Sequence, residues 1–314
     1  MSLKYLSHVG DIMRKFLLAL FITVTAITAH AGQVVPIVWP FSVGSNQVNF
    51  IRAIIDEANK QQTKYTFVTE FKAGAGGTVA AQYVRSHNSI ALLSSSSSFY
   101  VRPEFYPNPT ESHSTSDFKP VLIECTGQPY SINSVKYKTI DDVRKQKSLT
   151  IGVGLGSLTE AVARQFQQVV PNTELVFVPY SGTLQSLNDV LAGTLDLNVG
   201  LPTETLQFAN MGKVTVIGAT GTKEHPFFPT FNGQGVKGFE GLVSNYQMVI
   251  KSSTDSDVVE ELHTILRRAA KSSKTLQGFY AIDYCTGVDF DFNRTNEFFT
   301  QQTKYWPTKL KSLK

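Results

Sequence analysis

Short apolar runs alternate with amphipathic stripes along most of the chain. Val34–Trp39 is apolar and β-branched, which predicts a strand, and apolar side chains follow at helical spacing through residues 48–58. The same order recurs where the apolar run Leu149–Val153 precedes a helical stripe at Leu158–Val169. A strand followed by a loop and a helix, repeated in this way, is typical of a largely parallel sheet covered by helices.

The remaining elements follow the same pattern. Further strands are predicted at residues 66–69, 90–93, 121–124, 130–135, 175–178, 195–199 and 214–219. Further helices are predicted at residues 79–85, 140–145, 184–191 and 258–270, the last being the final helix. The pattern predicts an α/β protein with two lobes.

Three polar loops fall between a predicted strand and a predicted helix: Ser42–Asn46, Ser94–Ser98 and Gly154–Thr159. Ligands of open α/β sheets bind at the carboxyl ends of strands, and free N–H groups at helix N-termini attract anions. The loops offer hydroxyls and small residues but no lysine or arginine, which favours a carboxylate held reversibly. Ordinary helix capping and turn formation is the alternative interpretation of each loop.

Motifs for catalysis or cofactor binding are missing from the sequence. The glycine-rich stretch Gly152–Gly156 does not complete G-x-G-x-x-G, because Ser157 stands where the third glycine is needed. There is no P-loop, no G-x-S-x-G nucleophile elbow and no histidine spacing suited to zinc. We therefore predict a protein that is not an enzyme, with no catalytic residues, no metal and no cofactor.

The N-terminus resembles a secretory signal peptide. Met13, Arg14 and Lys15 precede the apolar run Phe16–Ala29, and Ala29-His30-Ala31 matches an A-x-A cleavage site. A membrane anchor is the alternative, but the run is shorter than the ~20 residues that cross a bilayer. Residues 1–31 are thus predicted to be removed on export to the periplasm, and either Met1 or Met13 is the true start.

Composition and charge fit a globular protein of 314 residues, with 42% hydrophobic and 17% charged residues. The formal net charge is +4, and residues 1–31 contribute three basic side chains and one acidic one, so the exported part carries +2. The charges are scattered, which argues against nucleic acid as a partner.

Two cysteines, Cys125 and Cys285, leave two interpretations open. In an oxidising compartment a pair invites a disulfide, and two separate small buried side chains are the alternative interpretation. Their spacing matches no metal site and no C-x-x-C motif.

Six short motifs follow one another in the loops. Trp39–Ser45 reads W-P-F-S-V-G-S, Ala73–Thr78 reads A-G-A-G-G-T, and Val178–Gly182 reads V-P-Y-S-G. The third motif continues with Leu187, Asp189, Gly193, Asp196 and Leu197, and the other three motifs are Gly200–Pro202, Gly212–Val214 and Gly238–Glu240. In this order they resemble motifs of the tricarboxylate-transport receptor family, the Bug or TctC type of periplasmic solute-binding protein, over nearly the whole exported chain.

The resemblance implies a two-lobed periplasmic-binding-protein fold (Venus-flytrap, type 2), with a hinge between two α/β domains. Residues 32–124 with 245–314 would form the first lobe, and residues 125–244 the second. Carried over by position, the ligand-binding residues would be Phe41, Ser42, Gly44, Ser45, Ser95, Ser96, Ser98, Gly156, Ser157, Thr159, Tyr180 and Pro202, with Asp189 in the polar network.

The implied function is capture of a small carboxylate, such as a di- or tricarboxylate, in the cleft between the lobes. The implied partners are subunits of a tripartite tricarboxylate-type membrane transporter or a sensor kinase, and we expect a monomer. Two alternatives remain: an exported interaction or sensor protein that has lost or altered ligand binding, and an exported hydrolase.

Overall fold

The structure is a computed structural model that describes residues 32–41, 43–44, 47–108, 110, 112–222, 224–225, 227–282 and 284–314. The predicted signal peptide, residues 1–31, lies outside the described residues. Two predicted site residues, Ser42 and Ser45, also lie outside them.

The first lobe is built on a six-stranded sheet. Its order is β11 (Thr286–Gly287), β4 (Phe118–Gln128), β10 (Ser244–Lys251), β3 (Leu92–Ser95), β1 (Gln33–Trp39) and β2 (Tyr65–Phe71). Strand β1 is parallel to β2 and β3, whereas β10 is antiparallel to β3 and β4. The parallel part therefore places the ends of β1 and β3 at one edge, where ligands of such sheets bind.

Helices cover both faces of this sheet. Helices α2 (Gln47–Gln61), α9 (Ser256–Ser272) and α10 (Lys274–Ile282) bury apolar side chains on one face. Helices α3 (Thr78–Ser86), α4 (Ser98–Phe105) and α11 (Phe292–Leu310) bury theirs on the other. Short 3-10 turns are η1 (Ala75–Gly77), η2 (Thr115–Asp117) and η3 (Lys311–Leu313).

The second lobe is built on a five-stranded sheet. Its order is β7 (Glu174–Pro179), β6 (Ser148–Val153), β8 (Leu197–Gly200), β5 (Ser131–Ser134) and β9 (Thr215–Ala219). Its helices are α5 (Ile140–Arg144), α6 (Leu158–Val169), α7 (Thr183–Leu191) and α8 (Pro202–Asn210). Strand β6 is parallel to β7 and β8, so the loops after β6 and β8 also meet at one edge.

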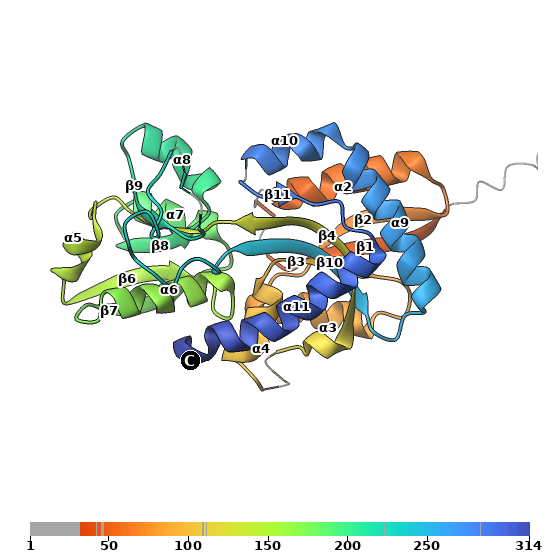
Figure 1. Cartoon of the computed structure of the whole chain (residues 1–314), viewed down its shortest axis with the longest axis horizontal. Coiled ribbons are helices and arrows are strands. Elements are labelled where there is room, and N and C mark those ends of the chain that lie inside the picture. The colour runs from red at the N-terminus through yellow and green to blue at the C-terminus, as the bar shows by residue number, and fades with distance from the viewer. Residues whose placement is uncertain are drawn as a thin grey trace, which may run out of the picture.

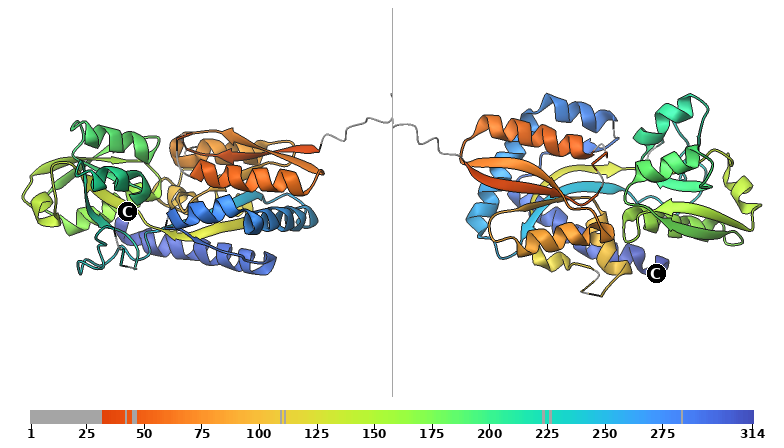
Figure 2. Two further views of the ribbon diagram at one scale, coloured as in Figure 1. Left: turned by 90° about the horizontal axis from the view of Figure 1, so that it is seen from above. Right: turned by 180° about the vertical axis from the view of Figure 1, so that it is seen from behind.

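The two lobes lie side by side, and the long strands β4 and β10 run between them (Figure 1). Figure 2 shows the same division from above and from behind. The chain enters the second sheet after Gln128 and returns at Ser244. The predicted lobe boundaries, at residues 124/125 and 244/245, fall within these two strands and stay a prediction.

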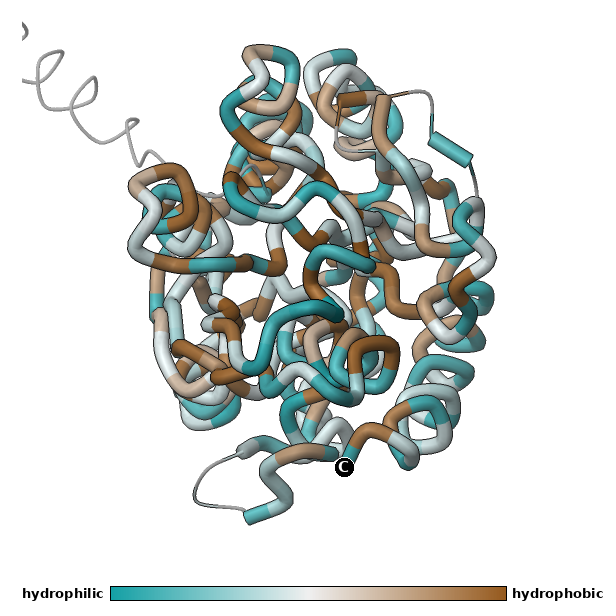
Figure 3. The backbone as a smooth tube through the Cα atoms, turned by 90° about the vertical axis from the view of Figure 1, so that its left-hand side faces the viewer, coloured by the Kyte–Doolittle hydropathy of each residue, from teal (hydrophilic) through white to brown (hydrophobic). Residues whose placement is uncertain are grey.

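Buried side chains in the core follow the apolar pattern of the sequence. Strand β1 buries residues 35–39, and α6 buries Leu158, Val162 and Phe166 on one stripe. One cluster of buried residues includes side chains of both lobes, among them Phe166 of α6 and Trp306 of α11. Hydrophobic and hydrophilic stretches accordingly alternate along the backbone in Figure 3.

The structure confirms the predicted strands and helices and adds elements that the pattern did not reveal. The prediction that residues 258–270 form the final helix is wrong, because α10 and α11 follow α9. Helices α4 and α8 and strand β10 were also not predicted. Strand β10 is buried inside its sheet, but it contains the polar residues Asn245 and Gln247. Its sequence therefore lacks the continuous apolar run that predicts a buried strand.

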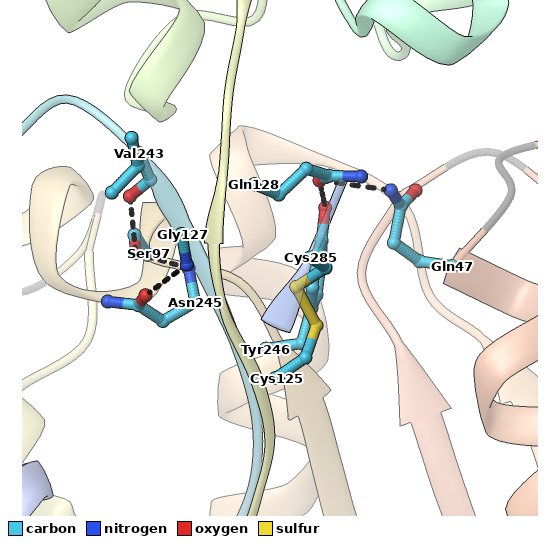
Figure 4. The surroundings of a disulfide bond; sticks show 9 residues. All are labelled: Gln47, Ser97, Cys125, Gly127, Gln128, Val243, Asn245, Tyr246 and Cys285. Atoms are coloured by element: carbon cyan, nitrogen blue, oxygen red, sulfur yellow. Dashed lines mark hydrogen bonds between the residues drawn. A yellow bond between two sulfur atoms is a disulfide. The ribbon is translucent and has the colours of Figure 1, made fainter. Parts of the chain in front are cut away.

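Cys125 and Cys285 form a disulfide, the first of the two interpretations that the sequence left open. Their Cα atoms are 5.7 Å apart, although the residues are separated by 160 positions. Figure 4 shows the bond beside the strand that leads out of the first lobe. Pairing of β11 with β4 sets Gly287 opposite Cys125 and brings the C-terminal segment to that strand.

Candidate functional site

A cavity of about 580 Å³ lies between the lobes and is lined by loops of both. This size is within the range of small-molecule binding sites. In the first lobe the lining includes residues that follow β1, form η1 or follow β3; in the second it includes residues that follow β6 and β7. The sequence predicted polar loops at three of these places, after β1, β3 and β6.

The serines after β3 differ in what they contact. Ser96 and Ser98 line the cavity, and the Ser96 hydroxyl accepts a hydrogen bond from the Ser98 N–H at 3.3 Å. Ser97 faces away: its hydroxyl donates to the Val243 carbonyl and accepts from the Asn245 N–H, at 3.2 and 2.9 Å. These two bonds, drawn in Figure 4, attach the serine loop to the start of β10.

The loop after β6 forms the N-terminus of α6. Ser157 is its N-cap: the Ser157 hydroxyl accepts from the Thr159 N–H at 3.2 Å and is 2.7 Å from the Thr159 hydroxyl. Thr159 in turn accepts from the Gly154 N–H at 2.8 Å. The Leu158 N–H donates to the Ser98 hydroxyl at 3.0 Å, which joins the two lobes at the cavity wall. Hydroxyls and the positive end of a helix thus meet here, an arrangement that favours an anion.

The loop after β7 contributes Tyr180. Its hydroxyl donates to the Asp189 carboxylate at 2.5 Å, and burial together with this carboxylate raises the pKa of Tyr180 to about 12. Tyr180 lines the cavity, whereas Asp189 lies behind it on α7. Asp189 therefore orients a lining side chain rather than facing the cavity.

The predicted site residues divide into three groups. Those that line the cavity are Phe41, Ser96, Ser98, Ser157, Thr159 and Tyr180. Those that do not are Gly44, Ser95, Gly156, Asp189 and Pro202, while Ser42 and Ser45 lie outside the described residues.

The residues outside the lining have other positions. Ser95 lies in β3, where its hydroxyl accepts from the Gln247 side chain at 3.5 Å. Pro202 begins α8, one residue past the lining residue Leu201. An added Cβ on Gly44 would meet Leu184 of the opposite lobe at 3.9 Å. Gly156 lies against the Arg102 side chain of α4.

Several residues that line the cavity were not predicted from the sequence. Arg102 and Tyr106 belong to α4 and the residue after it, and no helix was predicted there. Trp39, Tyr130 and Tyr246 line the cavity near the strands that join the lobes, but the first two read as strand residues and the third lies in the unpredicted β10. A signal for Arg102 was its spacing four residues after Ser98, which places both on one helix face.

The described part of the chain shows neither a metal-binding cluster nor a membrane-spanning helix. It contains no group of three or more His, Cys, Asp or Glu side chains that could hold a metal ion. None of its helices combines the length and the apolar character needed to cross a lipid bilayer.

The chain is similar in sequence to one protein family and to individual proteins of bacteria. The family model described as "Tripartite tricarboxylate transporter family receptor" matches residues 50–311. The "UPF0065 protein in tcbD-tcbE intergenic region" of Pseudomonas sp. (strain P51) is 26% identical over 74% of this chain and 73% of its own length. A UPF0065 protein of Agrobacterium vitis is 24% identical over 81% of this chain and 76% of its own.

Solved structures share the fold. The periplasmic binding protein BugD superposes with a TM-score of 0.75 at 23% identity, covering 90% of this chain and 97% of that one. Rpa4515 of R. palustris, solved with adipate, gives 0.77 at 19% identity over 91% and 98%. MatC of Rhodopseudomonas palustris, with bound malate, gives 0.75 at 19% identity over 90% and 99%.

These likenesses confirm the two-lobed periplasmic-binding-protein fold. The family and these structures are of binding proteins rather than enzymes. With more than half of its length matched by the family model, the chain belongs to the tripartite tricarboxylate transporter receptor family, as a solute-binding receptor of the Bug/TctC type.

Proposed function

We propose that this receptor captures a small carboxylate in the cavity between its lobes. The observation that carries the proposal is the meeting of Ser96 and Ser98 with Ser157, Thr159 and the N-terminus of α6 at one cavity wall. Hydroxyl donors and a helix N-terminus stabilise an anion without a permanent charge partner, which suits reversible capture. The bound adipate and malate of the two R. palustris structures support a carboxylate as ligand.

The proposal includes export and delivery. Residues 1–31 act as a cleavable signal peptide, and the mature protein works in the periplasm. Because the ligand touches both lobes, it favours the closed arrangement through contacts that the open one lacks. The closed receptor then passes the carboxylate to subunits of a tripartite transporter, or signals through a sensor kinase.

A thermal-shift screen of residues 32–314 against mono-, di- and tricarboxylates tests the function. A ligand at 100 times its dissociation constant adds about 2.7 kcal/mol to the free energy of unfolding, which raises Tm by several degrees. We expect a shift with one chemical subset of the acids. A flat response to the whole panel would contradict the receptor function and favour an exported interaction protein.

Ser157 and Ser95 differ in their position relative to the cavity, so their alanine variants are expected to differ in affinity for the carboxylate that the screen identifies. Ser157→Ala removes a lining hydroxyl and is expected to weaken carboxylate binding by about 1–3 kcal/mol. Ser95→Ala removes a buried hydroxyl that does not line the cavity and should leave the affinity unchanged. Titration calorimetry measures both.

Because Ser157 caps α6, the melting temperature of each free variant serves as the control for folding. Equal losses of affinity in the two variants, or no loss in either, would remove Ser157 from the binding site.

A further inference from the structure

Arg102 reaches from the first lobe to the second across the cavity wall. It belongs to α4, lines the cavity and is only 6% exposed. One guanidinium nitrogen, Nη1, donates to the Leu155 carbonyl of the opposite lobe at 3.4 Å. Among the described lining residues, Arg102 carries the only formally charged side chain.

Glycines on both lobes make room for this side chain. An added Cβ on Gly156 would lie 2.3 Å from Cδ and 2.5 Å from Nη1 of Arg102, and one on Gly76 would lie 3.2 Å from Cδ. Gly156 also has φ +76°, a conformation that side chains disfavour. The space filled by Arg102 therefore depends on glycine at position 156.

An aromatic ring holds the guanidinium in place. The Arg102 Cζ atom lies 4.0 Å from the centroid of the Tyr106 ring, a cation–π contact. The Tyr106 hydroxyl donates to Glu160 of α6 at 3.3 Å, so the ring is itself oriented from the second lobe. A guanidinium oriented in advance loses less side-chain entropy when it binds an anion.

We propose that Arg102 is a specificity-determining residue that binds a second anionic group of the ligand. The inference rests on the proposed function, in which neutral donors around Ser98 and Ser157 hold the first carboxylate. Arg102 lies one helical turn beyond Ser98, and its five N–H donors allow it to bind a ligand oxygen while keeping its contacts within the chain.

The apolar lining supports a ligand with two separated charges. Val153, Leu155, Val199 and Leu201 line the same cavity and suit the methylene chain of a dicarboxylate. A second carboxylate would accept a charge-assisted hydrogen bond from Arg102. A neutral amide of the same shape would accept a weaker one, because it carries no negative charge. Arg102 thereby selects between ligands of equal size.

The test compares aliphatic dicarboxylates of four to eight carbons with their half-amides by titration calorimetry. The wild-type protein is expected to bind the best dicarboxylate about 10- to 100-fold more tightly than its half-amide. Arg102→Gln is expected to reduce that ratio to near one, and Arg102→Lys to restore part of it, because lysine keeps the charge but not the planar fork.

Arg294→Gln is the matched control, since Arg294 pairs with Glu297 on the exposed side of α11. It should keep the wild-type ratio. A ratio near one in the wild-type protein, or an unchanged ratio in Arg102→Gln, would overturn the assignment while leaving the receptor function standing. Failure of all these dicarboxylates to bind the wild-type protein would overturn the assignment, and only a flat response to the whole mono-, di- and tricarboxylate panel would overturn the receptor function as well.

Discussion

Loss of the disulfide is expected to lower the free energy of unfolding by about 2–5 kcal/mol. The bond closes a loop of 160 residues, so its absence gives the unfolded chain much more conformational freedom. It also fixes the segment between α10 and β11 to β4, one of the strands that join the lobes. The double substitution Cys125→Ala and Cys285→Ala removes the bond without leaving buried thiols.

Urea unfolding of the wild-type and the double variant, each with and without reductant, measures this effect. Both cysteines are buried, so the wild-type protein is to be unfolded in reductant and then refolded in it. Reductant should shift the wild-type midpoint toward that of the variant and leave the variant unchanged. Identical midpoints for the oxidised wild-type protein and the variant would show that the bond adds no stability.

Strand β4, which carries Cys125, is also linked by hydrogen bonds to side chains that line the cavity. We therefore expect loss of the disulfide to affect ligand binding as well. Gln128, three residues after Cys125, accepts a hydrogen bond from the Tyr246 hydroxyl. The Gln47 amide donates to the same Gln128 oxygen at 3.4 Å, as Figure 4 shows. Tyr246 and Gln47 both line the cavity, so the strand held by the disulfide also supports two lining side chains.

Regular periodicity is what made part of the fold predictable. Strand β1 and helix α6 carry uninterrupted apolar patterns with clear end signals, and the predicted range of α6 agrees with the observed one. Helix α4 lacks such signals because it begins within a run of serines and contains Pro103. Helix α11 mixes threonine and glutamine with its buried Phe299 and Trp306, which hides the apolar stripe.

The candidate site was predictable only as far as loops at strand ends. Those loops led to Ser98 and Ser157. The Ser98 hydroxyl accepts a hydrogen bond across the cleft from the N–H of Leu158, a residue 60 positions further along the chain. Arg102 was missed because its place depends on the unpredicted α4. The disulfide stayed open for a related reason: the pairing of β11 with β4 is a long-range contact that no local pattern encodes.

The second large effect is expected from Glu124, whose carboxyl group makes the free energy of unfolding depend on pH. This residue of β4 is 2% exposed, and its only described side-chain hydrogen bond comes from the Ser94 hydroxyl at 3.5 Å. Burial raises the pKa of its carboxyl group from the usual 4.5 to about 8. Burial raises the pKa of the Tyr280 phenol of α10, and the charge of Glu124 raises it further.

The sign of the effect follows from the raised pKa. Below pH 4.5 the carboxyl group is protonated in the folded and unfolded states alike, and its contribution to stability is fully present. As the pH rises toward 8, the unfolded chain releases the proton while the folded protein retains it, so stability falls by about 1.4 kcal/mol per pH unit. Above the folded-state pKa both states are ionised and the loss ends.

Glu124→Gln keeps the shape of the side chain and removes its titration. Against the wild-type protein, we expect a gain in the free energy of unfolding that is about 1 kcal/mol at pH 5 and grows to about 4 kcal/mol at pH 8. Urea unfolding at pH 5, 6, 7 and 8 measures this difference. Glu297→Gln, the same change at an exposed acid on α11, is the matched control. Parallel pH profiles for wild-type and Glu124→Gln would mean that Glu124 is already ionised in the folded protein, and its hydrogen bond with Ser94 would then be an ionic one.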